Sequence, residues 1–276
     1  MLDSFVKRQM INPSNDQKQP LAALRNEIDR IDRGILDLLA QRMKTVATIA
    51  QQKSAQGLVF RARREIEKTQ KLDSLAQQLN IPQTMVFDIW RTIISTSSHS
   101  QRPFTLYCFG APILEQVALA YFGRNIPTHS SDNLDWVLEQ QQKSPDSVMC
   151  LFDKQNHDWW QKVATRKNDL SVVAELPWQN QNLPDAYLLA HCPTDLDADA
   201  DVLCILSTPE ATEEEIQTVF TDRLLHSEYD PKQDRWLIKL HDPNTQDSIA
   251  KMLECLRQPL PENWQLNCLG RYPRFH

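Results

Sequence analysis

One uninterrupted stretch, residues 21–54, constrains the fold more than any other part of the chain. Apolar residues recur along it at spacings of three and four: Leu24, Ile28, Ile31, Ile35, Leu38, Val46 and Ile49. Such spacing places them on one face of an α-helix. Because no proline interrupts the stretch, we predict a single helix about 50 Å long, at 1.5 Å per residue. A helix of this length with one apolar face requires a partner helix along much of it.

Two shorter helices are expected after a loop that contains Gly57. The first is predicted over residues 62–79, where Asn80-Ile81-Pro82 breaks it. The second is predicted over residues 82–101, with proline in its first turn and apolar residues along one face. Residues 21–101 are therefore expected to be entirely helical.

The pattern changes after Arg102-Pro103, where short apolar runs begin to alternate with amphipathic stretches. That alternation is typical of an α/β lobe. From residue 201 the predicted order becomes βαββαβ, and the acidic run 195–201 before it is interpreted as a solvated linker. The predicted division is a polar arm, a helical domain, a reduced α/β lobe and a βαββαβ domain, over residues 1–20, 21–101, 102–200 and 201–276.

The composition excludes the common nucleotide-dependent enzymes. The chain has 276 residues but only 5 glycines, and no G-x-G-x-x-G or G-x-x-x-x-G-K-[ST] pattern can be drawn from them. Metal sites are not expected either, because the six cysteines are scattered without a C-x-x-C pair. Most lie in short apolar runs, which favours buried free thiols.

The charge distribution favours a small anionic ligand. The net charge is −6, yet residues 21–101 contain twelve Lys and Arg against eight Asp and Glu. A basic block on an acidic protein suggests a site for a small anion, and it argues against nucleic acid, which requires a broader basic surface. No apolar run is long enough for a signal peptide or a membrane span, so we expect a cytoplasmic protein.

Several charged and polar residues recur at helical spacing within the basic block. Arg42 and Lys53 are eleven residues apart, which places them three turns apart on nearly the same face. The other candidates are Arg61 and Glu65, spaced by four with Arg64 adjacent, and Ser97 and Gln101, also spaced by four.

Taken together, residues 21–101 resemble the all-helical chorismate mutases found at the N-terminus of bifunctional chorismate mutase–prephenate dehydratases. The resemblance rests on the order, spacing and type of four groups of residues: Leu24-Arg25-x-x-Ile28-Asp29-x-Ile31-Asp32, Leu38-Leu39-Ala40-x-Arg42 with Lys53, Arg64-Glu65, and Ile93-Ile94-x-x-Ser97-x-x-x-Gln101. It implies an intramolecular rearrangement of chorismate to prephenate, which needs no metal or cofactor.

The resemblance also implies a role for each residue. Arg25 and Arg42 would bind the two carboxylates of chorismate, because a guanidinium matches a carboxylate with two hydrogen bonds. Lys53 and Gln101 would donate to the ether oxygen, Glu65 would accept from the ring hydroxyl, and Ser97 and Arg64 would support the carboxylate end.

The spacing of Arg25 and Arg42 predicts a dimer. They are 17 residues apart on one predicted helix, a separation of about 25 Å. No small substrate reaches both from one chain, so Arg25 of a second chain must complete the site. Two-fold symmetry then gives a homodimer with two shared sites, which agrees with the intertwined dimer of the family.

This chain departs from the family in the helical block and beyond it. Arg61 stands where the family commonly has an acidic residue, and the loop between Lys53 and Glu65 is one residue shorter. Arg61 would add a cation that strengthens binding of the dianion, and it would remove a contact to the ring hydroxyl, so the rate or the affinity would change.

Residues 102–200 resemble a reduced prephenate dehydratase, but Ala111-Pro112-Ile113-Leu114 replaces its polar loop and its catalytic Thr-Arg-Phe motif is missing. Dehydratase activity is therefore not expected.

Residues 201–276 resemble the ACT regulatory domain, best at the closing segment 269–274. Two effector-binding signatures of that domain are replaced. Glu210-Ala211-Thr212 stands in place of Gly-Ala-Leu, and His226-Ser227-Glu228-Tyr229 stands in place of Glu-Ser-Arg-Pro. Phenylalanine binding is therefore not expected.

Three functional hypotheses follow. The first is a dimeric, cofactor-free chorismate mutase of phenylalanine and tyrosine biosynthesis. The second is a non-catalytic, chorismate-mutase-like regulatory or docking subunit of the aromatic pathway. The third is a bifunctional mutase–prephenate dehydratase.

Overall fold

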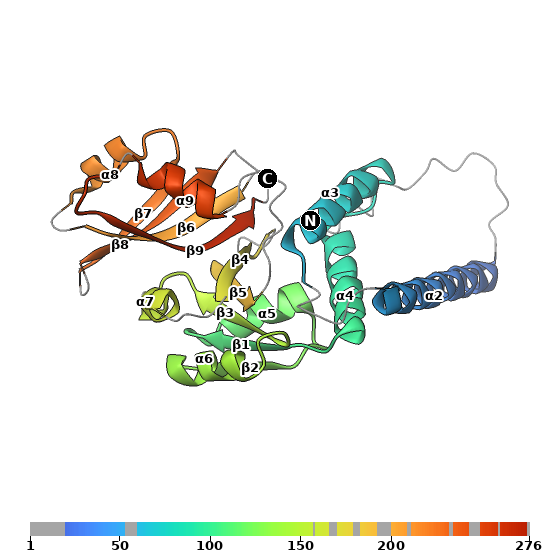
Figure 1. Ribbon diagram of the computed structural model, residues 1–276. Helices are drawn as coiled ribbons and strands as arrows, with labels where there is room; N and C mark the ends of the chain where they lie inside the picture. Colours follow the sequence, from blue (N-terminus) through green and yellow to red (C-terminus); the bar gives the residue numbers. More distant parts are fainter. Residues whose placement is uncertain are drawn as a thin grey trace. The chain divides into compact units, whose positions relative to one another are not determined.

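The computed structural model divides into two compact units, Met1–Gln52 and Lys53–His276, shown as a ribbon in Figure 1. The residues it describes are 20–52, 60–156, 158–165, 170–178, 183–191, 200–208, 211–231, 234–242, 249–258 and 260–274.

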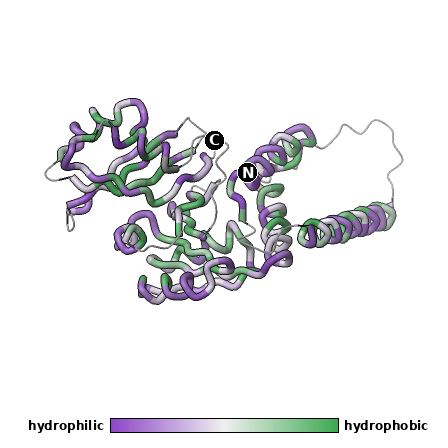
Figure 2. Tube along the Cα trace, viewed as in Figure 1, coloured by the Kyte–Doolittle hydropathy of each residue, from purple (hydrophilic) through white to green (hydrophobic). Residues whose placement is uncertain are grey.

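The described part of the first unit is one helix, α2 (Leu21–Gln52), which confirms the long helix predicted from the apolar spacing. No residue of α2 is buried. The apolar stripe lies open, with Leu24 46%, Ile28 57%, Ile31 48%, Ile35 51% and Leu38 65% exposed. Figure 2 shows hydrophobic and hydrophilic residues side by side along this helix. A continuous apolar stripe on a helix is expected to be covered by another element.

The second unit begins with the predicted pair of helices, α3 (Ala62–Gln78) and α4 (Gln83–Gln101). The chain reverses at Asn80, whose φ of 55° is left-handed, and α4 starts directly after Pro82. A small core of Leu72, Ala76 and Val86 holds the two helices together. Both helices also pack on the rest of this unit, α4 on α5 and α3 on β9.

The next segment alternates strands and helices, as predicted. Its elements are β1 (Thr105–Phe109), α5 (Leu114–Phe122), β2 (Thr128–Ser131), α6 (Leu134–Lys143), β3 (Val148–Asp153), α7 (Asp158–Thr165), β4 (Leu170–Leu176) and β5 (Ala186–His191). Strand β1 pairs parallel with β2 and β3, whereas β5 runs antiparallel to β3 and β4. The sequence analysis did not predict β2 or α7.

The final segment has the predicted βαββαβ order. Its elements are β6 (Ala200–Ser207), α8 (Glu213–Val219), β7 (Leu224–Asp230), β8 (Arg235–Asp242), α9 (Ile249–Arg257) and β9 (Gln265–Pro273). Side chains alternate along β6: Val202, Cys204 and Leu206 pack with α8 and α9, and Leu203 and Ile205 with α7.

The nine strands among the described residues form one mixed sheet, in the order β2-β1-β3-β5-β4-β9-β6-β8-β7. The two halves join where Val172 of β4 pairs with Gly270 of β9. A Cβ atom at Gly270 would lie 2.3 Å from the Val172 carbonyl oxygen, so glycine is what allows the strands to approach here.

Two expectations from the sequence need correction. Asp201 is not part of a solvated linker, because it lies in β6 and is 3% exposed. Its charge is balanced by Lys239 and Arg274. The cysteines are not uniformly buried. Cys108, Cys150 and Cys204 are buried, whereas Cys255 is exposed. Cys192 lies outside the described residues.

Candidate active site

The eight predicted site residues fall into three groups. Arg25 and Arg42 lie on α2, in the first unit. Arg61, Arg64, Glu65, Ser97 and Gln101 lie on or next to α3 and α4, in the second. Lys53 lies outside the described residues.

On α2, Arg25 is exposed and Arg42 is half-buried. Burial lowers the pKa of Arg42 from its ordinary value, although a guanidinium stays charged at neutral pH. Because α2 is one unbroken helix from Leu21 to Gln52, the two arginines are separated by about 25 Å. They therefore cannot bind one small dianion from the same copy of the helix.

Glu65, in the first turn of α3, is buried and already has two hydrogen-bond donors. Its Oε2 accepts from Arg91 Nη2 at 2.7 Å and from the Tyr121 hydroxyl at 2.8 Å. Glu65 is 8% exposed and Arg91 2%. A buried carboxylate requires such partners, because an unpaired charge inside a protein is strongly destabilising.

Arg91 and Tyr121, the partners of Glu65, were not among the residues predicted from the sequence. Arg91 Nε donates to the Tyr121 carbonyl oxygen at 3.0 Å, and its guanidinium lies 3.7 Å from the centre of the Tyr121 ring. Burial raises the pKa of Tyr121 well above its usual value, so the hydroxyl stays protonated and donates. One signal pointed to Arg91: it is a cation beside the apolar positions of α4, and a buried cation needs an acid nearby.

Positive charge gathers at the start of α3. Arg61 is its N-cap residue and is half-buried, and Arg64 is exposed. Arg63, between them, pairs with Glu67 at 2.8 Å. The N-terminus of a helix itself carries a partial positive charge. Arg61 and Arg64 add to this positive charge, which favours a small anion nearby.

Ser97 and Gln101 lie one turn apart on α4. The Ser97 hydroxyl donates to the Ile93 carbonyl oxygen at 2.6 Å, and Gln101 Nε2 donates to the Ser97 carbonyl oxygen at 3.3 Å. Ser97 is buried and Gln101 half-buried. The Gln101 amide therefore bonds to its own helix and would have to turn away from it to reach a ligand.

The loops at the carboxyl ends of β1 and β3 correspond to the predicted dehydratase-like region. Gly110 has a φ of 120°, and the Asp153 Cβ would lie 2.8 Å from a Cβ there. The neighbouring Lys154 is bound to Glu175, which also binds Lys239. Lys239 in turn pairs with Asp201 at 3.0 Å. The charged groups at this edge therefore neutralise one another across the two halves of the sheet.

Neither a metal centre nor a membrane span is found in the part of the chain that the structure describes. Its His, Cys, Asp and Glu side chains form no group of three or more that could hold a metal ion. Its helices also lack the combination of length and apolar character needed to cross a bilayer.

The helical part belongs to a recognised class of domain. Residues 24–102 match the family model of chorismate mutase type II. That range includes every predicted site residue, from Arg25 to Gln101. The chain therefore has a helical chorismate mutase type II domain, followed by a mixed-sheet α/β region.

A curated relative is similar to part of the chain. The T-protein of Enterobacter agglomerans is 33% identical over 91 residues, which are 32% of this chain and 24% of that protein. The chain thus matches about a quarter of the length of this curated relative.

Solved structures that resemble the chain are more distant. The prephenate dehydratase of Streptococcus mutans is 15% identical, with a TM-score of 0.43 over 61% of this chain and 97% of that one. The prephenate dehydratase of Staphylococcus aureus subsp. aureus Mu50 is 10% identical, with a TM-score of 0.41 over 61% of this chain and 100% of that one. The quorum quenching acylase GqqA is 12% identical, with a TM-score of 0.43 over 62% of this chain and 95% of that one.

Proposed function

We propose that this chain is a chorismate mutase, an intramolecular isomerase that converts chorismate to prephenate in phenylalanine and tyrosine biosynthesis. One observation carries the proposal: the match to chorismate mutase type II spans residues 24–102. This range contains seven cationic and polar residues in the family's order: Arg25, Arg42, Lys53, Arg64, Glu65, Ser97 and Gln101. We infer that the enzyme works in the cytoplasm.

The proposed chemistry needs positioning and charge stabilisation rather than a nucleophile. Chorismate is a dianion whose ether bond breaks as a carbon–carbon bond forms, so the site must hold a compact conformer. It must also stabilise the charge that develops on the ether oxygen. No cofactor takes part in this proposal.

Each residue has one role in this mechanism. Arg42 and Arg25 bind the two carboxylates, with Arg64, Ser97 and the additional cation Arg61 at the carboxylate end. Lys53 and Gln101 donate to the ether oxygen. Glu65 accepts a hydrogen bond from the ring hydroxyl.

We infer that the active form is a homodimer in which Arg25 comes from the partner chain. Two observations support the inference. The apolar stripe of α2 is 46–65% exposed at Leu24, Ile28, Ile31, Ile35 and Leu38, and a second α2 would cover it. Arg25 and Arg42 are also too far apart on one helix to meet the same substrate.

The test is turnover of chorismate, followed by absorbance, with prephenate identified as the product. Lys53→Ala should lower kcat at least about 100-fold, because one charge-assisted contact to a developing oxyanion is worth roughly 2.7–4 kcal/mol. Lys44→Ala, an exposed lysine on α2, is the control. A folded, dimeric wild-type protein without turnover would overturn the proposal.

A second candidate function is a non-catalytic docking or regulatory subunit of the aromatic pathway. It is favoured by Arg61 at an ordinarily acidic position and by the shortened loop between Lys53 and Glu65. It predicts co-purification with another enzyme of the pathway and no activity alone.

The α/β region has no proposed activity of its own. The βαββαβ order of β6 to β9 supports an ACT-like domain over residues 201–276, without phenylalanine binding. A third function, bifunctional mutase–dehydratase, predicts phenylpyruvate from prephenate, and absence of that product would exclude it.

A further inference from the structure

Glu65, Arg91 and Tyr121 join three helices through a buried hydrogen-bond network, which we call the Glu65 network. Glu65 lies on α3, Arg91 on α4, and Tyr121 on α5. The first two belong to the chorismate mutase domain, and α5 belongs to the α/β region that follows it. The network therefore connects a proposed active-site carboxylate with a part of the chain outside the mutase domain.

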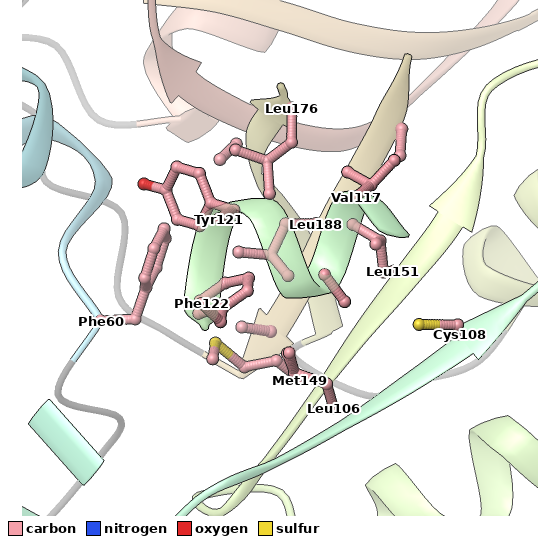
Figure 3. Packing of buried hydrophobic residues seen from close by; sticks show 14 of the residues in the cluster. Phe60, Leu106, Cys108, Val117, Tyr121, Phe122, Met149, Leu151, Leu176 and Leu188 are labelled. Atoms are coloured by element: carbon pink, nitrogen blue, oxygen red, sulfur yellow. The ribbon is translucent and has the colours of Figure 1, made fainter. Parts of the chain in front are cut away.

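Tyr121 is held rigidly. It is 1% exposed, and its ring centre lies 4.7 Å from that of Phe122, 4.9 Å from that of Trp178 and 6.5 Å from that of Phe60. Figure 3 shows the Tyr121 ring at the edge of this hydrophobic cluster, with its hydroxyl pointing out of it. The hydroxyl is thus a donor with a fixed position.

Both donors of the network reach the same oxygen of Glu65. Arg91 Nη2 and the Tyr121 hydroxyl bind Oε2, and about a tenth of the Glu65 side chain stays exposed. Two donors on one oxygen fix the orientation of the carboxylate. Neither of these two contacts uses the second oxygen, Oε1.

We propose that Tyr121, together with Arg91, is a positioning residue of the mutase site: it holds the Glu65 carboxylate so that Oε1 accepts from the ring hydroxyl of the substrate. The inference rests on the proposed mutase function. It assigns the α/β region a role in the reaction although that region has no chemistry of its own. Tyr121 does not touch the substrate and acts through Glu65.

The test compares the full-length wild type with Tyr121→Phe. Phenylalanine keeps the ring against Phe60, Phe122 and Trp178 and removes only the hydroxyl, so the variant is expected to fold, which circular dichroism checks. We expect kcat to fall about tenfold, the size of a lost hydrogen bond to a charged group. KM should change less than twofold, because the substrate carboxylates bind elsewhere.

Tyr229→Phe is the matched control. The Tyr229 hydroxyl also donates to a carboxylate, Asp234 Oδ1, at 2.9 Å, but it lies on β7, away from the network. We expect kcat of this variant to match the wild type. Arg91→Lys, which keeps the charge but loses the planar guanidinium, is a second variant of the network and should also lower kcat.

A double-mutant cycle with Glu65→Gln separates positioning from structural damage. If Tyr121 acts through the Glu65 carboxylate, Tyr121→Phe should lower kcat twofold or less in the Glu65→Gln background. A further tenfold loss in that background would overturn the inference, as would an unchanged kcat in Tyr121→Phe itself. Both of these results leave the mutase function standing, whereas absence of turnover in the wild type ends both proposals.

Discussion

The helix of the first unit and the helical pair of the second differ in what surrounds their predicted site residues. On α2, the apolar stripe is exposed and no residue is buried. On α3 and α4, Glu65, Arg91 and Ser97 are each buried, and the hydrogen bonds of Glu65 reach Tyr121 on α5. In the homodimer proposed above a second chain covers α2, whereas the α/β region of the same chain packs on α4 through α5.

The largest effect is expected from charges placed in the α2 stripe. Ile28→Asp with Ile35→Asp should weaken self-association at least 100-fold. Each buried isoleucine contributes roughly 1.5–3 kcal/mol, and a carboxylate in its place is costly to bury. Sedimentation equilibrium measures the change. Asp29→Ala with Arg33→Ala, on the same helix, is the control, and an unchanged dimer in the isoleucine variant would refute the partner helix.

The next effect distinguishes a buried ion pair from an exposed one. Arg91→Ala leaves Glu65 buried with one donor lost, which should lower the free energy of unfolding by about 3–5 kcal/mol. Arg30→Ala removes an exposed ion pair with Glu27 on α2 and should leave the free energy of unfolding unchanged. Urea denaturation measures both. Equal effects would contradict the contrast between the two units.

Alanine substitutions at two glycines, one in each unit, should have smaller effects on stability, and these effects should be of opposite sign. A Cβ at Gly270 would lie 2.3 Å from the Val172 carbonyl oxygen, whereas one at Gly34, on α2, meets nothing within 4 Å. Gly270→Ala should destabilise the protein by about 1–3 kcal/mol. Gly34→Ala should stabilise α2 by about 1 kcal/mol. Thermal melts of the two variants should therefore move in opposite directions, and a stabilised Gly270→Ala would show that β4 and β9 do not meet closely.

The smallest effect concerns Glu175, in the ion pairs between the two halves of the sheet. Burial opposes its charge, but Lys239 and Lys154 lower its pKa below the ordinary value. A lowered pKa contributes stability above the unfolded-state pKa of about 4.3, and this is lost as pH falls through the folded-state pKa.

Glu175→Gln should therefore lower the free energy of unfolding by about 1–2 kcal/mol at pH 7 and by less near pH 3. Glu139→Gln, in an exposed pair with Lys143, is the control. A loss that is equal at both pH values would contradict the ion-pair role of Glu175.

The sequence predicted the elements that carry a strong local pattern. The bounds of α2, α3 and α4 follow from apolar spacing and from the break at residues 79–82, and the βαββαβ order follows from alternating runs. Strand β2 (Thr128–Ser131) was missed because it is polar and is a strand only through its pairing with β1. Helix α7 was missed because eight residues are too short for a clear helical period.

The environment of the candidate site was less predictable than its residues. Glu65 and Ser97 could be picked out by type and spacing. The partners of Glu65 lie 26 and 56 residues away, and no local pattern relates positions at that separation. The continuous sheet depends likewise on one close approach, at Gly270.

The most direct test of the account is turnover of chorismate by the purified 276-residue chain, with the product identified. The account predicts prephenate as the product, without added metal or cofactor, and a kcat that falls at least about 100-fold in Lys53→Ala. A folded dimer that leaves chorismate unchanged would contradict it and would favour the docking subunit instead.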